Sequence, residues 1–97
     1  MKTKVKQLRS RNGNQVANQF EITQTKKDYQ AHIFQSYDTI ISKIIYSKGK
    51  RIIYLDKEAF NYSRTTSKYL YQFMMMNKKE IENLITNKKA IFKNLNK

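Results

Sequence analysis

Residues 51–76, RIIYLDKEAFNYSRTTSKYLYQFMMM, decide the fold class because the spacing of apolar residues changes within them. The run before Asp56 is short, β-branched and aromatic, which is typical of a strand. From Ser63 onward, apolar residues recur every three or four positions, which predicts an amphipathic helix over residues 64–76. Strands followed by helices indicate the α+β class.

Two segments upstream of this stretch also have strand character. Residues 15–24 alternate between apolar and polar side chains, which places Val16, Phe20 and Ile22 on one face of a half-buried strand. After a polar turn, residues 31–35 predict a second, shorter strand. The expected strands therefore precede the expected helices along the chain.

Residues 37–46, YDTIISKIIY, fit either a short helix or a strand. Their isoleucines would share one side of a helix, but β-branched side chains favour a strand. The turn at residues 47–50 then joins this strand to residues 51–55, and Gly49 stands where such a hairpin needs a positive φ. We expect a small antiparallel sheet of three to four strands, followed by two C-terminal helices.

The two ends of the chain are interpreted as units outside the central domain. Residues 1–14 form a basic N-terminal arm, which either frays in solvent or binds phosphates. Residues 15–76 form the α+β domain. Residues 77–97 form a C-terminal helix, which begins with a capping box of Asn77 and Glu80. The apolar stripe of this helix is a candidate contact for a partner or for a homodimer.

The net charge of the chain says more about its possible functions than any sequence motif does. The 97 residues carry 20 Lys and Arg against 7 Asp and Glu, a net charge of +13. Part of the lysine count is explained by an AT-rich genome, but the shortage of acids is not. A small body with so much like charge repels itself, and a polyanion such as DNA or RNA would neutralise it and gain counterion entropy.

Other absences limit the chemistry and the location. The chain has no Cys and one His, so we expect no metal site and no cofactor. It has no apolar run long enough to cross a bilayer, and we expect no membrane partner. The lack of Cys fits a reducing compartment such as the cytoplasm.

The candidate contacts with a polyanion form three clusters of Lys, Arg and Ser. Each cluster also has a purely structural explanation: a frayed end for the arm, a solvated turn for the hairpin tip, and a helix cap for the helix start. In the last group, Arg64 and Lys68 are four positions apart and project from one side of the helix, next to backbone amides that suit a phosphate. The candidates are Arg9 and Arg11 in the arm, Lys48, Lys50 and Arg51 at the hairpin tip, and Ser63, Arg64 and Lys68 at the helix start.

Aromatic residues add a second kind of contact with nucleic acid. The sequence interleaves seven Tyr and five Phe with basic residues. Most of them are expected to fill the core or its rim, since the chain has no Trp. Tyr37 and Tyr54 are the candidates for stacking on unpaired bases.

Catalysis has little support in the sequence. A catalytic triad could be composed from Ser36, His32 and Asp38. A histidine on a strand, however, more commonly packs against its neighbours or forms a local hydrogen bond. The chain has few carboxylates that could bind the two metal ions of a nuclease site. We therefore expect a protein that is not an enzyme.

Three motifs carry a resemblance to known proteins: Asn18-Gln19-Phe20, Phe34-Gln35-Ser36-Tyr37, and the stretch YSRTTSKYLYQF at residues 62–73. Through them the chain resembles a group of small proteins of unknown function that phages and plasmids of low-GC bacteria encode. The resemblance covers about residues 12–76 and departs at Phe60, where the group has Trp. It implies an origin in a mobile element, and therefore a location in the cytoplasm of a bacterial host cell, and it identifies no activity.

Together these patterns predict a small basic accessory protein that binds nucleic acid or a nucleoprotein electrostatically. The alternative is an anti-CRISPR-like or other counter-defence protein that inhibits a host nucleic-acid effector by direct binding. A basic inhibitor of this kind cannot mimic DNA, so it would act on the protein or on its guide RNA.

Overall fold

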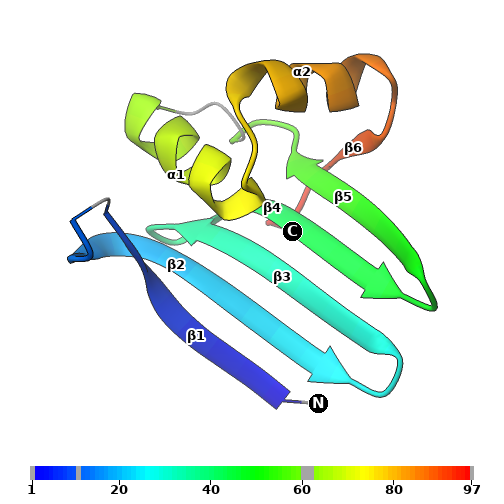
Figure 1. The fold of residues 1–97 in the computed structure, drawn as a ribbon, viewed down its shortest axis with the longest axis horizontal. Helices are drawn as coiled ribbons and strands as arrows, with labels where there is room; N and C mark the ends of the chain where they lie inside the picture. Colours follow the sequence, from blue (N-terminus) through cyan, green and yellow to red (C-terminus); the bar gives the residue numbers. More distant parts are fainter. Residues whose placement is uncertain (1, 11, 60–62, 97) are drawn as a thin grey trace.

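One six-stranded sheet carries two helices on one of its faces (Figure 1). The computed structural model describes residues 2–10, 12–59 and 63–96. The first five strands run antiparallel in chain order, and the sixth lies parallel to the fifth. The elements are β1 (Lys2–Arg9), β2 (Gln15–Lys26), β3 (Tyr29–Ser36), β4 (Thr39–Ser47), β5 (Lys50–Asp56), α1 (Arg64–Met74), α2 (Lys78–Thr86) and β6 (Ala90–Lys93).

The α+β class agrees with this architecture, but the expected sheet of three to four antiparallel strands is wrong. The described sheet has six strands and is mixed. Both missed strands come from the chain ends that the sequence analysis placed outside the domain. The central hairpin was predicted correctly: residues 37–46 contribute to a strand, and Lys48 and Gly49 have positive φ angles in the turn to β5.

Residues 2–9 form an edge strand instead of a basic arm. Strand β1 pairs with β2 from Lys2↔Thr25 to Gln7↔Phe20. Most of its side chains are exposed, and only Leu8 is buried. The strand therefore lacks the alternation of apolar and polar residues by which a strand is predicted from sequence. Lysines along an edge strand discourage pairing with other chains, which explains a charged sequence in this position.

The C-terminal helix ends far earlier than expected. Helix α2 stops at Thr86, Lys88 takes a positive φ, and the chain returns as the short strand β6 beside β5. The α2 part of the apolar stripe packs on the chain's own core, where Ile81 is buried and Leu84 and Ile85 lie partly covered. The stripe therefore gives no reason to expect a homodimer through this helix.

Strand β2 contains a backbone irregularity that corrects a second prediction. Asn18 has a φ of 65°, and its carbonyl oxygen accepts a hydrogen bond from the Tyr37 amide at 2.6 Å. This kink puts Val16 on the helix-covered side, whereas Phe20 and Ile22 face the other side. Gln19 turns inward and is only 1% exposed, and its Oε1 has no hydrogen-bond partner among the described residues.

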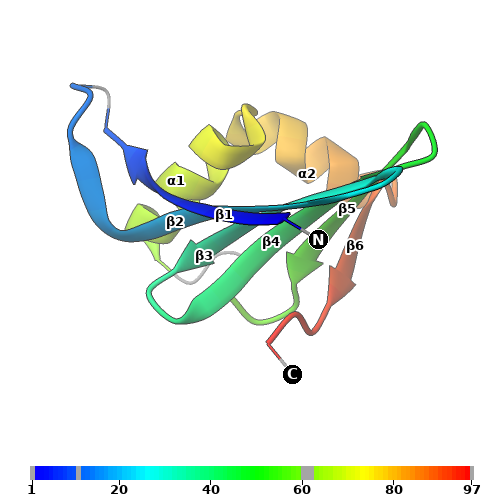
Figure 2. The same cartoon turned by 90° about the horizontal axis from the view of Figure 1, so that it is seen from below.

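Both helices begin where the sequence predicted. The Ser63 hydroxyl accepts from the Thr66 amide at 3.1 Å and caps α1, and the capping box of Asn77 and Glu80 begins α2. Apolar residues of α1 and α2 then pack on the concave side of the curved sheet (Figure 2). This core contains Leu8, Phe34, Ile41, Ile44, Ile53, Leu55, Ala59, Tyr69, Leu70, Met74, Ile81 and Ala90.

The opposite face of the sheet is not covered by any described element. Register pairs place one residue from each strand in a row across it, and this row is mostly apolar. Ile33, in the middle strands, is still buried by its neighbours, while the ends of the row are exposed. The row is Val5, Ile22, Ile33, Lys43, Tyr54 and Ile91.

A buried carboxylate ties the end of β5 to the segment after β6. The two oxygens of Asp56 accept from the amides of Glu58 (3.2 Å), Ala59 (3.0 Å) and Leu95 (2.8 Å) and from the side chain of Asn96 (3.1 Å). Burial raises the pKa of this carboxyl, but the four hydrogen bonds outweigh it and leave the pKa below its ordinary value. Asp56 is therefore a structural anion.

Candidate polyanion-binding groove

An open groove of about 1000 Å³ runs along α1. One wall is the exposed side of α1, the other is the end of β1, and the start of α2 closes one end. Among the described residues that line it, four are Lys or Arg and none is acidic. The lining residues are Arg9, Ser10, Ser63, Arg64, Ser67, Lys68, Tyr71, Gln72, Met75, Met76, Asn77 and Lys78.

Arg9 is held in the groove by two hydrogen bonds. Its carbonyl oxygen accepts from the Gln72 side-chain amide at 2.7 Å, which connects β1 to α1. Its guanidinium donates through Nη1 to the Gly13 carbonyl oxygen at 2.7 Å. A guanidinium has five N–H donors, so this contact leaves most of them for an anion.

Arg64 and Lys68 lie one turn apart on the exposed side of α1, as the sequence predicted. The Lys68 ammonium lies 5.4 Å from the centroid of the Tyr69 ring, a distance at which a cation is attracted to the aromatic face. Tyr69 is buried in the core, so this contact gives Lys68 a fixed support next to the groove.

Ser63 lies in the groove but its hydroxyl is already used. It accepts from the Thr66 amide at 3.1 Å and is placed to donate to the Thr66 hydroxyl at 3.0 Å. These bonds make Ser63 a helix cap, which was the alternative explanation for this residue. The cations of the groove remain as its anion-binding groups.

Lys78 is the residue that sequence reasoning missed. It begins α2 and lines the groove together with the cations of α1 and β1. Its ammonium lies 3.9 Å from a carboxylate oxygen of Glu82, and both side chains are largely exposed. Exposed pairs of this kind contribute little and are easily exchanged for another anion. The turn between the two helices places Lys78 in the same groove as Lys68. The sequence predicted the break before Asn77 but not the direction that the chain takes after it.

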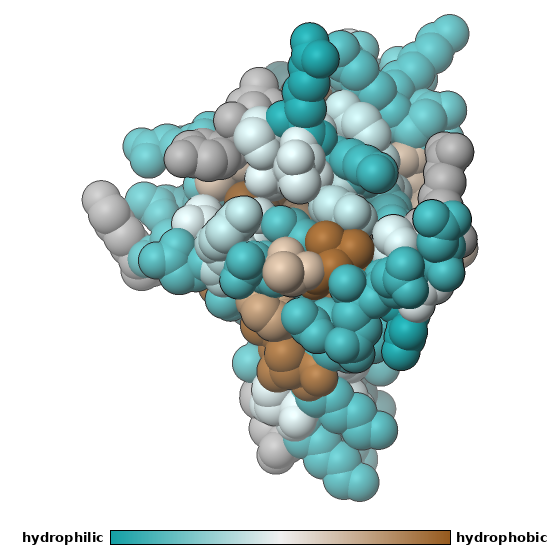
Figure 3. All heavy atoms as spheres, turned by 90° about the vertical axis from the view of Figure 1, so that its left-hand side faces the viewer, coloured by the Kyte–Doolittle hydropathy of each residue, from teal (hydrophilic) through white to brown (hydrophobic). Residues whose placement is uncertain are grey.

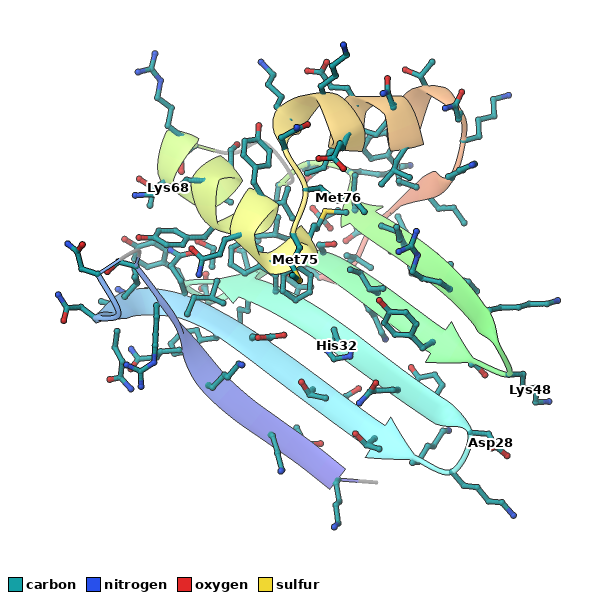
Figure 4. The ribbon with its side chains drawn as sticks, in the orientation of Figure 1. Asp28, His32, Lys48, Lys68, Met75 and Met76 are labelled. Carbon is teal, nitrogen blue, oxygen red and sulfur yellow. The ribbon has the colours of Figure 1, made fainter. Side chains whose placement is uncertain are left out.

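The hairpin-tip candidates lie at the opposite end of the molecule. Figure 4 shows Lys48 at the tip of the β4–β5 hairpin and Lys68 on α1, on opposite sides of the structure. The β2–β3 hairpin lies beside this tip, because the Ser47 hydroxyl donates to the Asp28 carbonyl oxygen at 3.3 Å. Lys50 and Arg51 are exposed and point to opposite faces of the sheet. Arg11 lies outside the described residues.

The two candidate stacking residues are also separate from the groove. Tyr37 is 64% exposed in the β3–β4 turn, where it has a positive φ. Tyr54 lies on the uncovered face of the sheet, with the Lys93 ammonium 5.2 Å from its ring centroid. Neither tyrosine lines the groove, although Tyr37 shares a second pocket with Ser63 and Thr66 at the start of α1.

Ser36, His32 and Asp38 do not form a catalytic triad in the structure. His32 Nδ1 lies 3.8 Å from a Glu21 oxygen, and the His32 ring packs edge-on against Tyr46. The Ser36 hydroxyl faces the Thr66 hydroxyl at 3.4 Å. These are local contacts of the kind that the sequence analysis favoured for the histidine.

Fold and groove define a small, basic α+β protein with a cationic cleft beside its first helix. The chain belongs to the Family of unknown function (DUF8033), whose model matches residues 3–94. The match extends beyond the resemblance noted over residues 12–76, so β1 and β6 belong to the family's domain. No curated protein and no solved structure matches the chain significantly. No helix in the described part of the chain is long and apolar enough to span a membrane.

Proposed function

We propose that this protein binds nucleic acid electrostatically through the groove along α1, without catalysis. The observation that carries the proposal is the gathering of Arg9, Arg64, Lys68 and Lys78 in one groove with no acidic neighbour among its described lining residues. Cations placed in this way neutralise phosphates and release the counterions that surround them. An origin in a phage or plasmid and a cytoplasmic location are part of the same proposal.

The charge of the whole chain supports the choice of a polyanion. Only two lysines of the described residues, Lys6 and Lys78, form an ion pair with a carboxylate. Asp56, one of the few acids, is already bonded to backbone and side-chain donors. The net charge of +13 therefore remains largely uncompensated within the chain.

A titration of a labelled oligonucleotide at several salt concentrations tests the proposal. Four phosphate contacts predict a plot of log affinity against log salt with a slope of about −3 for a single strand. The variant Arg64→Gln with Lys68→Gln is expected to weaken binding and to reduce the slope by about 1.4. The matched control is Lys50→Gln with Arg51→Gln, which removes the same charges at the opposite end of the molecule.

Two results would contradict the proposal. Equal losses from the groove pair and the hairpin pair would mean that the chain binds through its net charge and not through the groove. Absence of oligonucleotide binding at physiological salt, together with capture of a host protein that survives nuclease treatment, would favour a protein inhibitor instead.

A further inference from the structure

The cationic groove also contains an apolar surface, formed by Tyr71, Met75 and Met76. Met75 is 90% exposed, the largest exposed fraction among the large hydrophobic residues described. Figure 4 places Met75 and Met76 at the junction of α1 and α2, where the groove meets Lys78. Seen from the α1 side, the surface is mostly hydrophilic around small hydrophobic areas (Figure 3).

The backbone at Met75 makes this exposed methionine unusual. Met75 ends α1 with φ 57° and ψ 38°, the left-handed conformation. Its amide donates to the Gln72 carbonyl oxygen at 3.2 Å, and the Met76 amide donates to the Tyr71 carbonyl oxygen at 3.1 Å. These two bonds form a Schellman motif, in which glycine usually occupies the left-handed position. The chain instead has a large apolar side chain there, directed to solvent beside four cations.

The combination of cations and an exposed apolar surface selects between forms of nucleic acid. A duplex presents phosphates on its outside and keeps its bases stacked inside. An unpaired nucleotide presents its phosphate and the face of its base to the same surface, and bases stack on aromatic and apolar side chains. Resting on the function proposed above, we infer that the groove takes single-stranded nucleic acid.

In this arrangement the phosphates lie along Arg9, Arg64 and Lys68, and a base packs against Tyr71 and Met75. An acidic protein segment is the competing occupant, because it also combines negative charge with apolar side chains. The +13 net charge and the absence of acids among the described lining residues favour a ligand with a charge on every unit. This is a property of a phosphate backbone.

Fluorescence anisotropy with three labelled probes of equal length tests the inference. The probes are a single strand, the corresponding duplex, and an abasic strand that keeps the phosphates and sugars without bases. We expect the single strand to bind at least about 5-fold more tightly than the abasic strand, since one stacked base is worth about 1–3 kcal/mol. We expect the duplex, like the abasic strand, to bind more weakly than the single strand.

Met75→Gly is the informative variant, because glycine prefers the backbone conformation at this position. It is expected to reduce single-strand affinity about 3-fold or more, to leave abasic-strand affinity unchanged, and to keep or raise the thermal midpoint. Tyr71→Leu keeps an apolar side chain against the core and removes the ring, and it should reduce single-strand affinity in the same selective way.

The possible failures are distinguishable. Salt-dependent binding that is equal for all three probes, and unchanged by Met75→Gly, would overturn the inference and leave the proposed function intact. Failure of every probe to bind would overturn both. Tighter binding of the duplex than of the single strand would also overturn the inference, since the apolar surface would then have no base to contact.

Discussion

The side-chain amide of Gln72 donates a hydrogen bond of 2.7 Å to the carbonyl oxygen of Arg9, across 63 positions of sequence. This bond joins α1 to the end of β1, which form the two walls of the groove. The spacing between the cations of the two walls therefore depends on a neutral residue. The relationship makes Gln72 a positioning residue.

Gln72→Leu is expected to separate the two walls without unfolding the domain. Loss of one exposed neutral hydrogen bond should lower the free energy of unfolding by about 1 kcal/mol or less. Oligonucleotide affinity should fall at low salt, and the salt slope should decrease by about 0.7, the contribution of one phosphate contact. Gln30→Leu, an exposed glutamine on β3, is the control and should leave the slope unchanged. An unchanged slope in Gln72→Leu would mean that Arg9 stays in place without this bond.

Asp56 is expected to make stability depend on pH in the acid range. Its folded-state pKa lies below the ordinary value of about 3.9, so the ionised form stabilises the fold. This contribution is fully present above about pH 5 and is lost as the pH falls through the lowered folded-state pKa. Asp56→Asn should cost about 2 kcal/mol at pH 7, because hydrogen bonds to a charged acceptor are lost.

Urea denaturation between about pH 3 and pH 7 measures this effect. The difference between the natural chain and Asp56→Asn should shrink as the pH falls. Asp28→Asn, in an exposed turn, is the control and should stay within about 0.5 kcal/mol. A difference for Asp56→Asn that is independent of pH would contradict an electrostatic role for the carboxylate.

Gln19→Met is expected to leave stability unchanged or to raise it by about 1 kcal/mol. Gln19 is buried, and its Oε1 has no partner in the described part of the structure, which is an unfavourable state for a polar atom. Methionine has a similar shape and is flexible enough to fill the same space. Chemical denaturation measures the change. A loss of more than about 2 kcal/mol would show that the Gln19 side chain is hydrogen-bonded in solution.

Ser63→Ala is expected to lower the free energy of unfolding by about 1 kcal/mol, because it removes the N-cap of α1. Ser67→Ala, one turn further along the same helix, is the matched control and should be neutral or slightly stabilising, since alanine is the better helix former. Thermal denaturation of the two variants separates the cap from a general effect of serine. Equal midpoints would refute the capping role.

Local chemistry made the central elements predictable. The Ser63 cap, the capping box at Asn77 and the Gly49 turn are each specified by a few neighbouring residues. The edge strands were not predictable in this way. Strand β1 needs few apolar residues because most of its side chains remain in solvent, and β6 has only four residues whose pairing partner lies more than thirty positions earlier. The strand count was therefore too low.

The candidate site was predictable in part. Arg64 and Lys68 share a helix face, so their spacing in sequence predicts their proximity. Arg9 joins them through the Gln72 bond, which is a tertiary contact. Lys78 joins them through the direction that the chain takes after Met75, which the predicted break at Asn77 does not specify. In β2, the positive φ of Asn18 reversed the facing of Val16 relative to Phe20, and alternation alone cannot reveal such a kink.

The position of β6 has a consequence for the order of assembly. Its partner β5 is complete at Asp56, but β6 emerges from the ribosome only after both helices, at residues 90–93. During synthesis the backbone N–H and C=O groups along the outer edge of β5 therefore stay unpaired until β6 has been made. Unpaired strand edges of this kind favour aggregation of nascent chains. Strand β6 thus covers this edge of β5 at Ile53–Asp56, and a translational pause between α2 and β6 would prolong its exposure.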